Sequence, residues 1–432
     1  MSAPVLPGES DPLLAPEVLT AQRTTVWTLS GAAVFGGVAV AGAIPAGALL
    51  AASIADSDAA AGFAQTSGVI GAALLALPLA RVALTRGRRT ALSLGYGIGA
   101  IGAVVVVIAA TQRSLLLVYL GCVLVGVASA AGLQARYAAT DLAAESHRAR
   151  ALSFVVWAST VGAVLGPNLL NASGNLGLEL GLPQLAGPYV VSAACLAVAA
   201  VVLWLFLRPD PYRMAMAIQK KATGVVHHAS LREGLAHLRE RPRAAVGIAA
   251  ISAGHICMVM VMVMTPVHMA HVDVTLQLIG FVISVHVAGM YAFSPIVGWA
   301  VDSYGRVQVV VIGIVILLLA CVISGAAPGD SIVMLGIGLF LLGLGWSCTL
   351  IAGSTMVTDE VDAEKRPAVQ GLSDLIMNTS GAMGGIVAGL VILWSTYAML
   401  CAVAAIPVLV LAALVVQPRI RNGKAVQTQR LD

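Results

Sequence analysis

Twelve apolar runs, each long enough to cross a bilayer as a helix, most strongly limit how this chain can fold. A spanning helix needs about 20 mainly apolar residues. The runs lie at roughly 26–52, 60–84, 91–110, 115–136, 151–172, 188–207, 244–266, 274–297, 307–326, 332–356, 368–393 and 396–416. Only 10% of the residues are charged, against about 25% in a soluble domain. We therefore predict an all-α membrane protein with twelve transmembrane helices and no separate soluble domain.

A polar stretch divides the runs into two sets of six. We expect a cytoplasmic N-terminal tail at 1–25, an N-terminal six-helix bundle at 26–207, a cytoplasmic central loop at 208–243, a C-terminal six-helix bundle at 244–416 and a cytoplasmic C-terminal tail at 417–432. The central loop contains the sequence LREGLAHLRERPR. We expect the loop to form a short amphipathic helix on the membrane surface.

The basic residues predict the orientation. If the N-terminus is cytoplasmic, 23 of the 24 Lys and Arg residues lie in the tails and inner loops, and only Arg113 lies outside. Because positive charge marks inner loops, we expect a multi-pass protein of the cytoplasmic membrane with both termini inside. Since the basic residues sit in short loops, the net charge of +4 does not indicate nucleic-acid binding.

The two halves also repeat at a fixed spacing. Gly87-Arg88 recurs as Gly305-Arg306, and Thr140-Asp141 recurs as Thr358-Asp359. Both matches have the same separation along the chain, which we call the repeat offset. Matches at one offset, at equivalent places in the hydropathy pattern, indicate duplication. Parallel six-helix halves are an architecture of secondary transporters.

A loop motif carries a family resemblance. Residues 298–306 read GWAVDSYGR, which resembles the motif Gly-x-x-x-Asp-x-x-Gly-Arg of the major facilitator superfamily. The resemblance covers essentially the whole chain and implies a twelve-helix carrier in two pseudo-symmetric bundles. It also implies that Gly298, Asp302, Gly305 and Arg306 latch one conformation. Asp302 can face a helix N-terminus, and Arg306 can pair with Asp359 or Glu360.

The first-half copy of this motif is incomplete. It retains Arg88 but has Leu84 where the aspartate belongs. Asp141 can still pair with Arg88, which would add both residues to the latch. The alternative is that these charges are solvated loop ends.

A second motif bears on the cargo. Residues 162–168 read GAVLGPN and look like the start of the motif of drug antiporters in this superfamily. Small residues at this spacing also allow tight helix crossing, and we prefer that interpretation. Cys122 stands near the place where many drug/proton antiporters of the family have an arginine, which counts against a standard drug exporter.

Between His255 and Met290 the chain gathers six of its fourteen methionines and four of its eight histidines. Successive helical residues rotate by about 100°, so Met258 and Met262 share a face with His255. On the next span His286 and Met290 are one turn apart. Thioether and imidazole ligands suit copper(I), so these two stripes predict a soft-metal site between the helices.

The same spacing resembles the CcoA-like copper importers of the major facilitator superfamily, which implies inward transport of copper as the substrate. Met260 and Met264 give an alternative register. Methionine is also ordinary apolar filler in membrane helices, and this alternative stays open for Met260 and Met264.

Three further polar residues lie inside apolar runs. Asp374, with Asn378 one turn on, can carry a coupling proton if it faces a central cavity. If it lies nearer the cytoplasmic surface, it caps a helix or pairs with Lys365 or Arg366. Asn168 can line the first-half side of the cavity.

We therefore predict a monomeric secondary transporter in the lipid bilayer that works by alternating access and moves copper inward, and not an enzyme. No cofactor is expected, and the sequence has no phosphate-binding loop that would indicate ATP-driven pumping. The alternatives are a small-molecule or drug exporter of the same fold and a non-transporting membrane scaffold or sensor.

Overall fold

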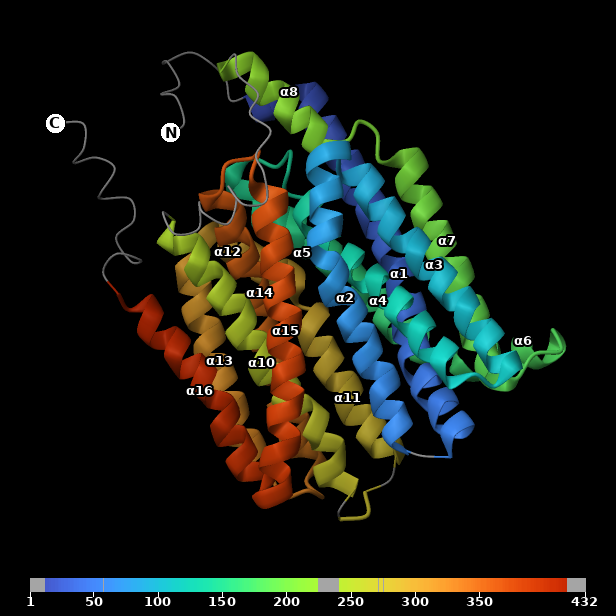
Figure 1. Ribbon diagram of the computed structural model, residues 1–432. Coiled ribbons are helices and arrows are strands. Elements are labelled where there is room, and N and C mark those ends of the chain that lie inside the picture. Colours follow the sequence, from blue (N-terminus) through green and yellow to red (C-terminus); the bar gives the residue numbers. More distant parts are fainter. Residues whose placement is uncertain (1–11, 57, 224–240, 271, 275, 418–432) are drawn as a thin grey trace.

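The computed structural model describes residues 12–56, 58–223, 241–270, 272–274 and 276–417, and all regular structure within them is helical. Figure 1 shows the arrangement. The longer helices are α1 Pro16–Ala55, α2 Asp58–Arg86, α3 Arg88–Gln112, α4 Leu115–Ala138, α5 Arg148–Asn168, α6 Leu170–Glu179, α7 Gly187–Phe206, α8 Pro211–Thr223, α10 Pro242–Ala270, α11 Leu276–Tyr291, α12 Ser294–Tyr304, α13 Arg306–Ala326, α14 Ile332–Glu360, α15 Arg366–Trp394 and α16 Tyr397–Val415.

Twelve helical segments in the described residues are long and apolar enough to cross a membrane, which confirms the predicted fold class. Two of the differences from the predicted boundaries involve proline. Helix α1 begins at Pro16, well before the apolar run, because proline is favourable in the first turn of a helix. The span predicted at 274–297 is divided into α11 and α12. Pro295, in the first turn of α12, cannot donate a backbone hydrogen bond that would continue α11.

The helices pack in two groups. Helices α1 to α7 contact mainly one another, and so do α10 to α16 apart from α12, which lies mainly against α5. In Figure 1 the first group, blue to green, lies to the right of the second, yellow to red. The main contacts between the groups join α2 to α15 and α5 to α12.

Helix α8 lies in the stretch predicted as the central loop. Its residues Met214 and Ile218 pack against Val18 near the start of α1. The hydroxyl of Tyr212 donates to the carbonyl of Glu364, just before α15, at 3.0 Å. Helix α8 therefore contacts both groups at one end of the molecule, while most of the LREGLAHLRERPR segment lies outside the described residues.

The predicted repeat has a structural counterpart. Gly87 and Gly305 precede α3 and α13 with φ angles of 90° and 107°. Glycine adopts this conformation without strain. The two halves therefore make the same turn at positions separated by the repeat offset.

Candidate functional site

The two groups of helices meet closely at the end where α1 begins. A Cβ atom added to Gly298 of α12 would overlap Ser153 of α5, and one added to Gly371 of α15 would overlap Ala80 of α2. Ala80 precedes Gly298 by the repeat offset, and Ser153 precedes Gly371 by the same separation. Equivalent positions of the two halves therefore make both close contacts.

Asp302 lies at the α5–α12 contact. Its carboxylate accepts backbone hydrogen bonds from Ala149 at 3.2 Å and Arg150 at 3.0 Å, in the first turn of α5. The first N–H groups of a helix have no partner within the helix and carry partial positive charge. Asp302 thus joins the second half to a helix N-terminus of the first.

Arg306 and Asp359 form part of the same contact region. The Arg306 Nε donates to Asp359 Oδ2 at 2.8 Å, and its Nη2 donates to the Glu145 carbonyl at 2.6 Å. Arg148 of α5 donates to Asp359 Oδ1 at 2.6 Å. The expected Arg306–Asp359 pair is present, while Glu360 pairs with Arg243 instead.

The corresponding charges of the first half are buried and are not solvated loop ends. Arg88 Nε donates to Asp141 Oδ2 at 2.8 Å, and the exposed fractions of the two side chains are 1% and 2%. The Arg88 guanidinium also donates to the side-chain oxygen of Gln370 on α15. This pair therefore also links the two groups of helices.

Asp374 pairs across the groups with Arg136 of α4. Arg136 Nη2 donates to Asp374 Oδ1 at 2.7 Å, and the side chains are only 2% and 0% exposed. Arg136 Nε also donates to Ser354 of α14 at 3.3 Å. The other polar atoms, Arg136 Nη1 and Asp374 Oδ2, are buried without a hydrogen-bond partner among the described residues. Neither Lys365 nor Arg366 is the ion-pair partner of Asp374.

An aromatic cluster lies near this pair. Trp346 Nε1 of α14 donates to His255 Nδ1 of α10 at 3.1 Å, and the Trp346 and Tyr291 rings meet edge to face with centroids 5.8 Å apart. His255 and Tyr291 both lie within electrostatic reach of Arg136. The three rings therefore join α10, α11 and α14 within the second half, and His255 and Tyr291 are near enough to Arg136 to be affected by its charge.

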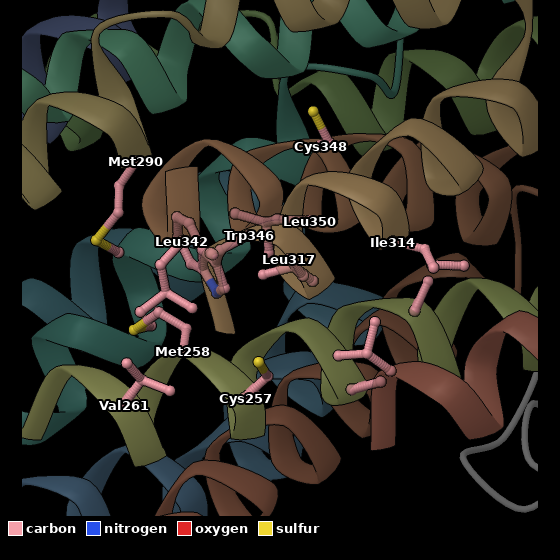
Figure 2. Close-up of a cluster of buried hydrophobic side chains, with 14 of the residues drawn as sticks. Cys257, Met258, Val261, Met290, Ile314, Leu317, Leu342, Trp346, Cys348 and Leu350 are labelled. Carbon is pink, nitrogen blue, oxygen red and sulfur yellow. The ribbon is translucent and has the colours of Figure 1, made fainter. Parts of the chain in front are cut away.

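The methionine stripe of α10 faces several neighbours. Met258 and Met260 are buried, whereas Met262 and Met264 are partly buried at the edge of the same apolar cluster. Met260 packs against Gly384 of α15. Figure 2 shows Met258 and Met290 among apolar side chains that include Leu342 and Trp346 of α14.

His286 and Met290 are both buried on α11. The Nδ1 of His286 bonds the carbonyl oxygen of Leu339 on α14 at 2.8 Å. A carbonyl only accepts hydrogen bonds, so this nitrogen donates and Nε2 carries the lone pair. Nε2 is buried without a hydrogen-bond partner among the described residues.

The predicted packing of the two metal-binding stripes differs from the structure. Helices α10 and α11 both pack along α14 and contact each other much less. The histidines also differ from each other, because the Nδ1 of His255 accepts a hydrogen bond and the neutral ring then carries its proton on Nε2. Among the described residues, no group of three or more His, Cys, Asp or Glu side chains is arranged to hold a metal ion.

The remaining predicted residues lie away from this cluster or bond locally. Asn168 is exposed and donates to Val164 of its own helix, and Asn378 donates to the carbonyl of Asp374. His268 stacks on Tyr397 with ring centroids 4.3 Å apart. These contacts place Asn168 outside the group of side chains around Asp374.

Sequence reasoning missed Arg136 and Trp346. Arg136 is the last residue of its apolar run, so it was counted with the cytoplasmic loop, although α4 continues to Ala138. In the structure Arg136 donates a hydrogen bond to Ser354, its counterpart at the repeat offset, but Arg and Ser are not a sequence match, so the repeat does not single out Arg136. Trp346 also had no signal within its apolar run.

The chain is similar to known transporters over most of its length. A family model described as Major Facilitator Superfamily matches residues 26–273 and 257–430. The uncharacterized MFS-type transporter YdeG of Bacillus subtilis (strain 168) is 38% identical over 399 residues, 92% of each chain. The riboflavin transporter RfnT of Brucella anthropi is 27% identical over 320 residues, 74% of this chain and 77% of that one.

A solved structure has the same fold. The E. coli fucose:proton symporter FucP matches with a TM-score of 0.68 at 15% sequence identity. The match covers 90% of this chain and 98% of that one.

Proposed function

The chain belongs to the Major Facilitator Superfamily and is a secondary transporter, and we propose that it carries a small organic solute by alternating access, coupled to protons through Asp374. The observation that carries this proposal is the buried Arg136–Asp374 pair, which joins α4 of one half to α15 of the other. When the halves separate at this end, the pair must break. The ionic state of Asp374 then depends on the conformation.

Once separated from Arg136, Asp374 favours its protonated form. A carboxylate that loses its cation in an apolar region is expensive to keep ionised and becomes neutral instead. Oδ2 of Asp374 has no hydrogen-bond partner among the described residues and is the natural atom to bind the proton. Intramembrane carboxyl groups commonly act as proton relays in transporters.

The aromatic cluster supports a solute with a planar ring. Trp346, Tyr291 and His255 offer ring faces and edges beside Arg136. Aromatic rings pair favourably in offset or edge-to-face geometry. Similarity to a protein named as a riboflavin transporter agrees with a ring-bearing solute, so riboflavin is the probe of choice.

The test uses purified protein in lipid vesicles with an imposed pH gradient, and flavin fluorescence as the readout. We expect wild-type protein to concentrate riboflavin. Asp374→Asn should still exchange riboflavin down its gradient but no longer concentrate it. Asp330→Asn, which neutralises an exposed carboxylate between α13 and α14, is the matched control.

Concentration by Asp374→Asn as strong as that of wild type would contradict the coupling role. If wild-type protein carries no riboflavin, a pH-sensitive dye inside the vesicles identifies solutes that move protons with them. Reversing the gradient distinguishes uptake from the export alternative.

Inward copper transport is the second candidate, and His286 is the observation that favours it. Metal-binding histidines usually donate one ring nitrogen to a carbonyl and present the other to the ion. His286 has this arrangement, since Nδ1 is bonded to Leu339 and Nε2 is buried without a partner among the described residues. Met258, Met262 and Met290 are its proposed thioether partners, with Met260 and Met264 in the other register.

The copper test measures uptake of copper(I) under reducing conditions. The candidate predicts loss of uptake in both His286→Ala and Met258→Leu, with unchanged uptake in the exposed control His147→Ala. Uptake at the wild-type rate in both site variants would exclude these ligands.

We further propose the cytoplasmic membrane as the location, with both termini inside, on the strength of the 23 inner basic residues and the positive-inside rule.

We propose the monomer as the working unit, because a single chain contributes both halves of the site. We also propose that the Gly298–Arg306 motif, with Asp359, Arg88 and Asp141, latches the closed end. A non-transporting scaffold or sensor would not need buried ion pairs between the two halves, so we favour a transporter over that alternative.

A further inference from the structure

A basic hollow opens on the surface where α7 ends and α8 begins. It has a volume of about 630 Å³ and is lined by Arg89, Arg208, Pro209, Asp210, Arg213 and Met214. The lining residues include three arginines and one aspartate, a formal charge of +2, and the surface that they present to the hollow is mostly apolar. None of its lining residues belongs to the Arg136–Asp374 pair, the aromatic cluster or the proposed latch.

Exposed aromatic side chains border the hollow. Trp204 and Phe206, in the last turn of α7, are 46% and 60% exposed. Exposed aromatic residues directly beside basic ones mark the membrane interface. The Arg89 guanidinium also lies over the Trp204 ring, 4.7 Å from its centroid. This arrangement is the one expected where a helix leaves the acyl chains and enters the headgroup layer.

The Asp210 carboxylate in the lining accepts hydrogen bonds from backbone N–H groups on both sides of the hollow. Its Oδ2 accepts the backbone N–H of Arg89 at 2.7 Å, and its Oδ1 accepts the backbone N–H of Arg213 at 3.1 Å. The carboxylate thus caps the N-termini of α3 and α8 together. Among the described residues, no carboxylate forms an ion pair with the exposed Arg208 or Arg213, so both guanidinium groups can bind another anion.

We propose that this hollow binds the phosphate of an anionic phospholipid headgroup. Arginine matches phosphate with paired N–H donors, and basic hollows at the cytoplasmic ends of membrane helices suit acidic lipids. Arg208 and Arg213 contact the phosphate, while the acyl chains lie along Trp204 and Phe206. A free phosphate ion shares the phosphate chemistry but makes no use of this apolar flank.

Native mass spectrometry of the full-length protein in neutral detergent tests the proposal. The titrants are a phosphatidylglycerol, a phosphatidylcholine and inorganic phosphate. We expect phosphatidylglycerol to bind tightest, and Arg208→Gln/Arg213→Gln to weaken it by about tenfold or more, the equivalent of about 1.4 kcal/mol. The matched control is Arg23→Gln/Arg81→Gln, which removes two exposed charges outside the hollow and should leave binding unchanged.

Two outcomes would overturn the proposal. The first is phosphatidylglycerol binding that is equally strong in Arg208→Gln/Arg213→Gln and wild type. The second is displacement of bound phosphatidylglycerol by inorganic phosphate together with equally tight binding of phosphatidylcholine. That result would assign the hollow to soluble phosphate or to non-selective lipid contact. Brominated phosphatidylglycerol gives a second readout, because it should quench less fluorescence in Trp204→Phe than in wild type.

Discussion

The buried pair of Arg136 and Asp374 is the residue-scale feature on which the proposed mechanism depends. Burying two charges is costly, and each is tolerated only because the other is 2.7 Å away. Removing one partner leaves the other charge uncompensated, whereas removing both leaves no buried charge at this contact.

This difference gives the first prediction. Arg136→Ala should destabilise the protein by about 3–5 kcal/mol because Asp374 remains buried and unpaired. Arg136→Leu/Asp374→Leu should recover most of that stability and still not transport. Thermal unfolding in detergent and vesicle transport are the two measurements. A double variant as unstable as the single one would show that the pair is not the source of the loss.

The contacts between individual side chains were the hardest feature to predict from the sequence. Asp374 was recognised as an intramembrane carboxyl group, but its partner could not be found because α4 extends beyond its apolar run to Ala138. The proposed metal-binding stripes show a related limit. Helical spacing shows which residues share a face, yet it cannot show that α14 packs against both α10 and α11.

At the scale of helices, the two contacts between the halves are not equivalent. Asp302 accepts N–H groups from Ala149 and Arg150 of α5. At the repeat offset, Leu84 replaces this aspartate, and Pro367 and Ala368 replace the two donors. Leucine cannot accept a hydrogen bond and proline cannot donate one. The α2–α15 contact therefore lacks the polar connection of the α5–α12 contact and depends on close packing.

Gly371 gives the prediction at this scale. Gly371→Leu should push α15 away from Ala80 of α2 and cost the closed arrangement about 1–3 kcal/mol. Gly385→Leu on the same helix is the control, since an added Cβ there meets nothing within 4 Å. Hydrogen–deuterium exchange in α2 and α15 measures the difference. Equal exchange in the two variants would argue against the contact.

At the scale of the whole molecule, the sequence predicted most of the fold. Twelve spans followed from hydropathy, and the repeat indicated a duplication that the equivalent turns at Gly87 and Gly305 reflect. The exceptions have local causes. Pro295 divides one span into α11 and α12, and α8 forms at Pro211–Thr223 in a stretch whose charge pattern gave no boundaries.

The proposed orientation gives a whole-molecule prediction. In intact cells, a membrane-impermeant maleimide should label Arg113→Cys but should reach Arg81→Cys only after permeabilisation, because both positions are exposed at opposite ends of the bundle. The native protein is the background control, since five of its six cysteines are buried and Cys195 is partly buried. The reverse labelling pattern would place the termini outside.

The two hydrogen bonds of Asp210 also bear on the order of biosynthesis. The start of α3 emerges from the ribosome long before the residue that caps it, so this inner corner of the first half remains incomplete until residue 210 has been made. A fragment ending at Leu207 contains all six spans of that half but lacks the cap. A first half that includes this cap therefore extends at least through Asp210.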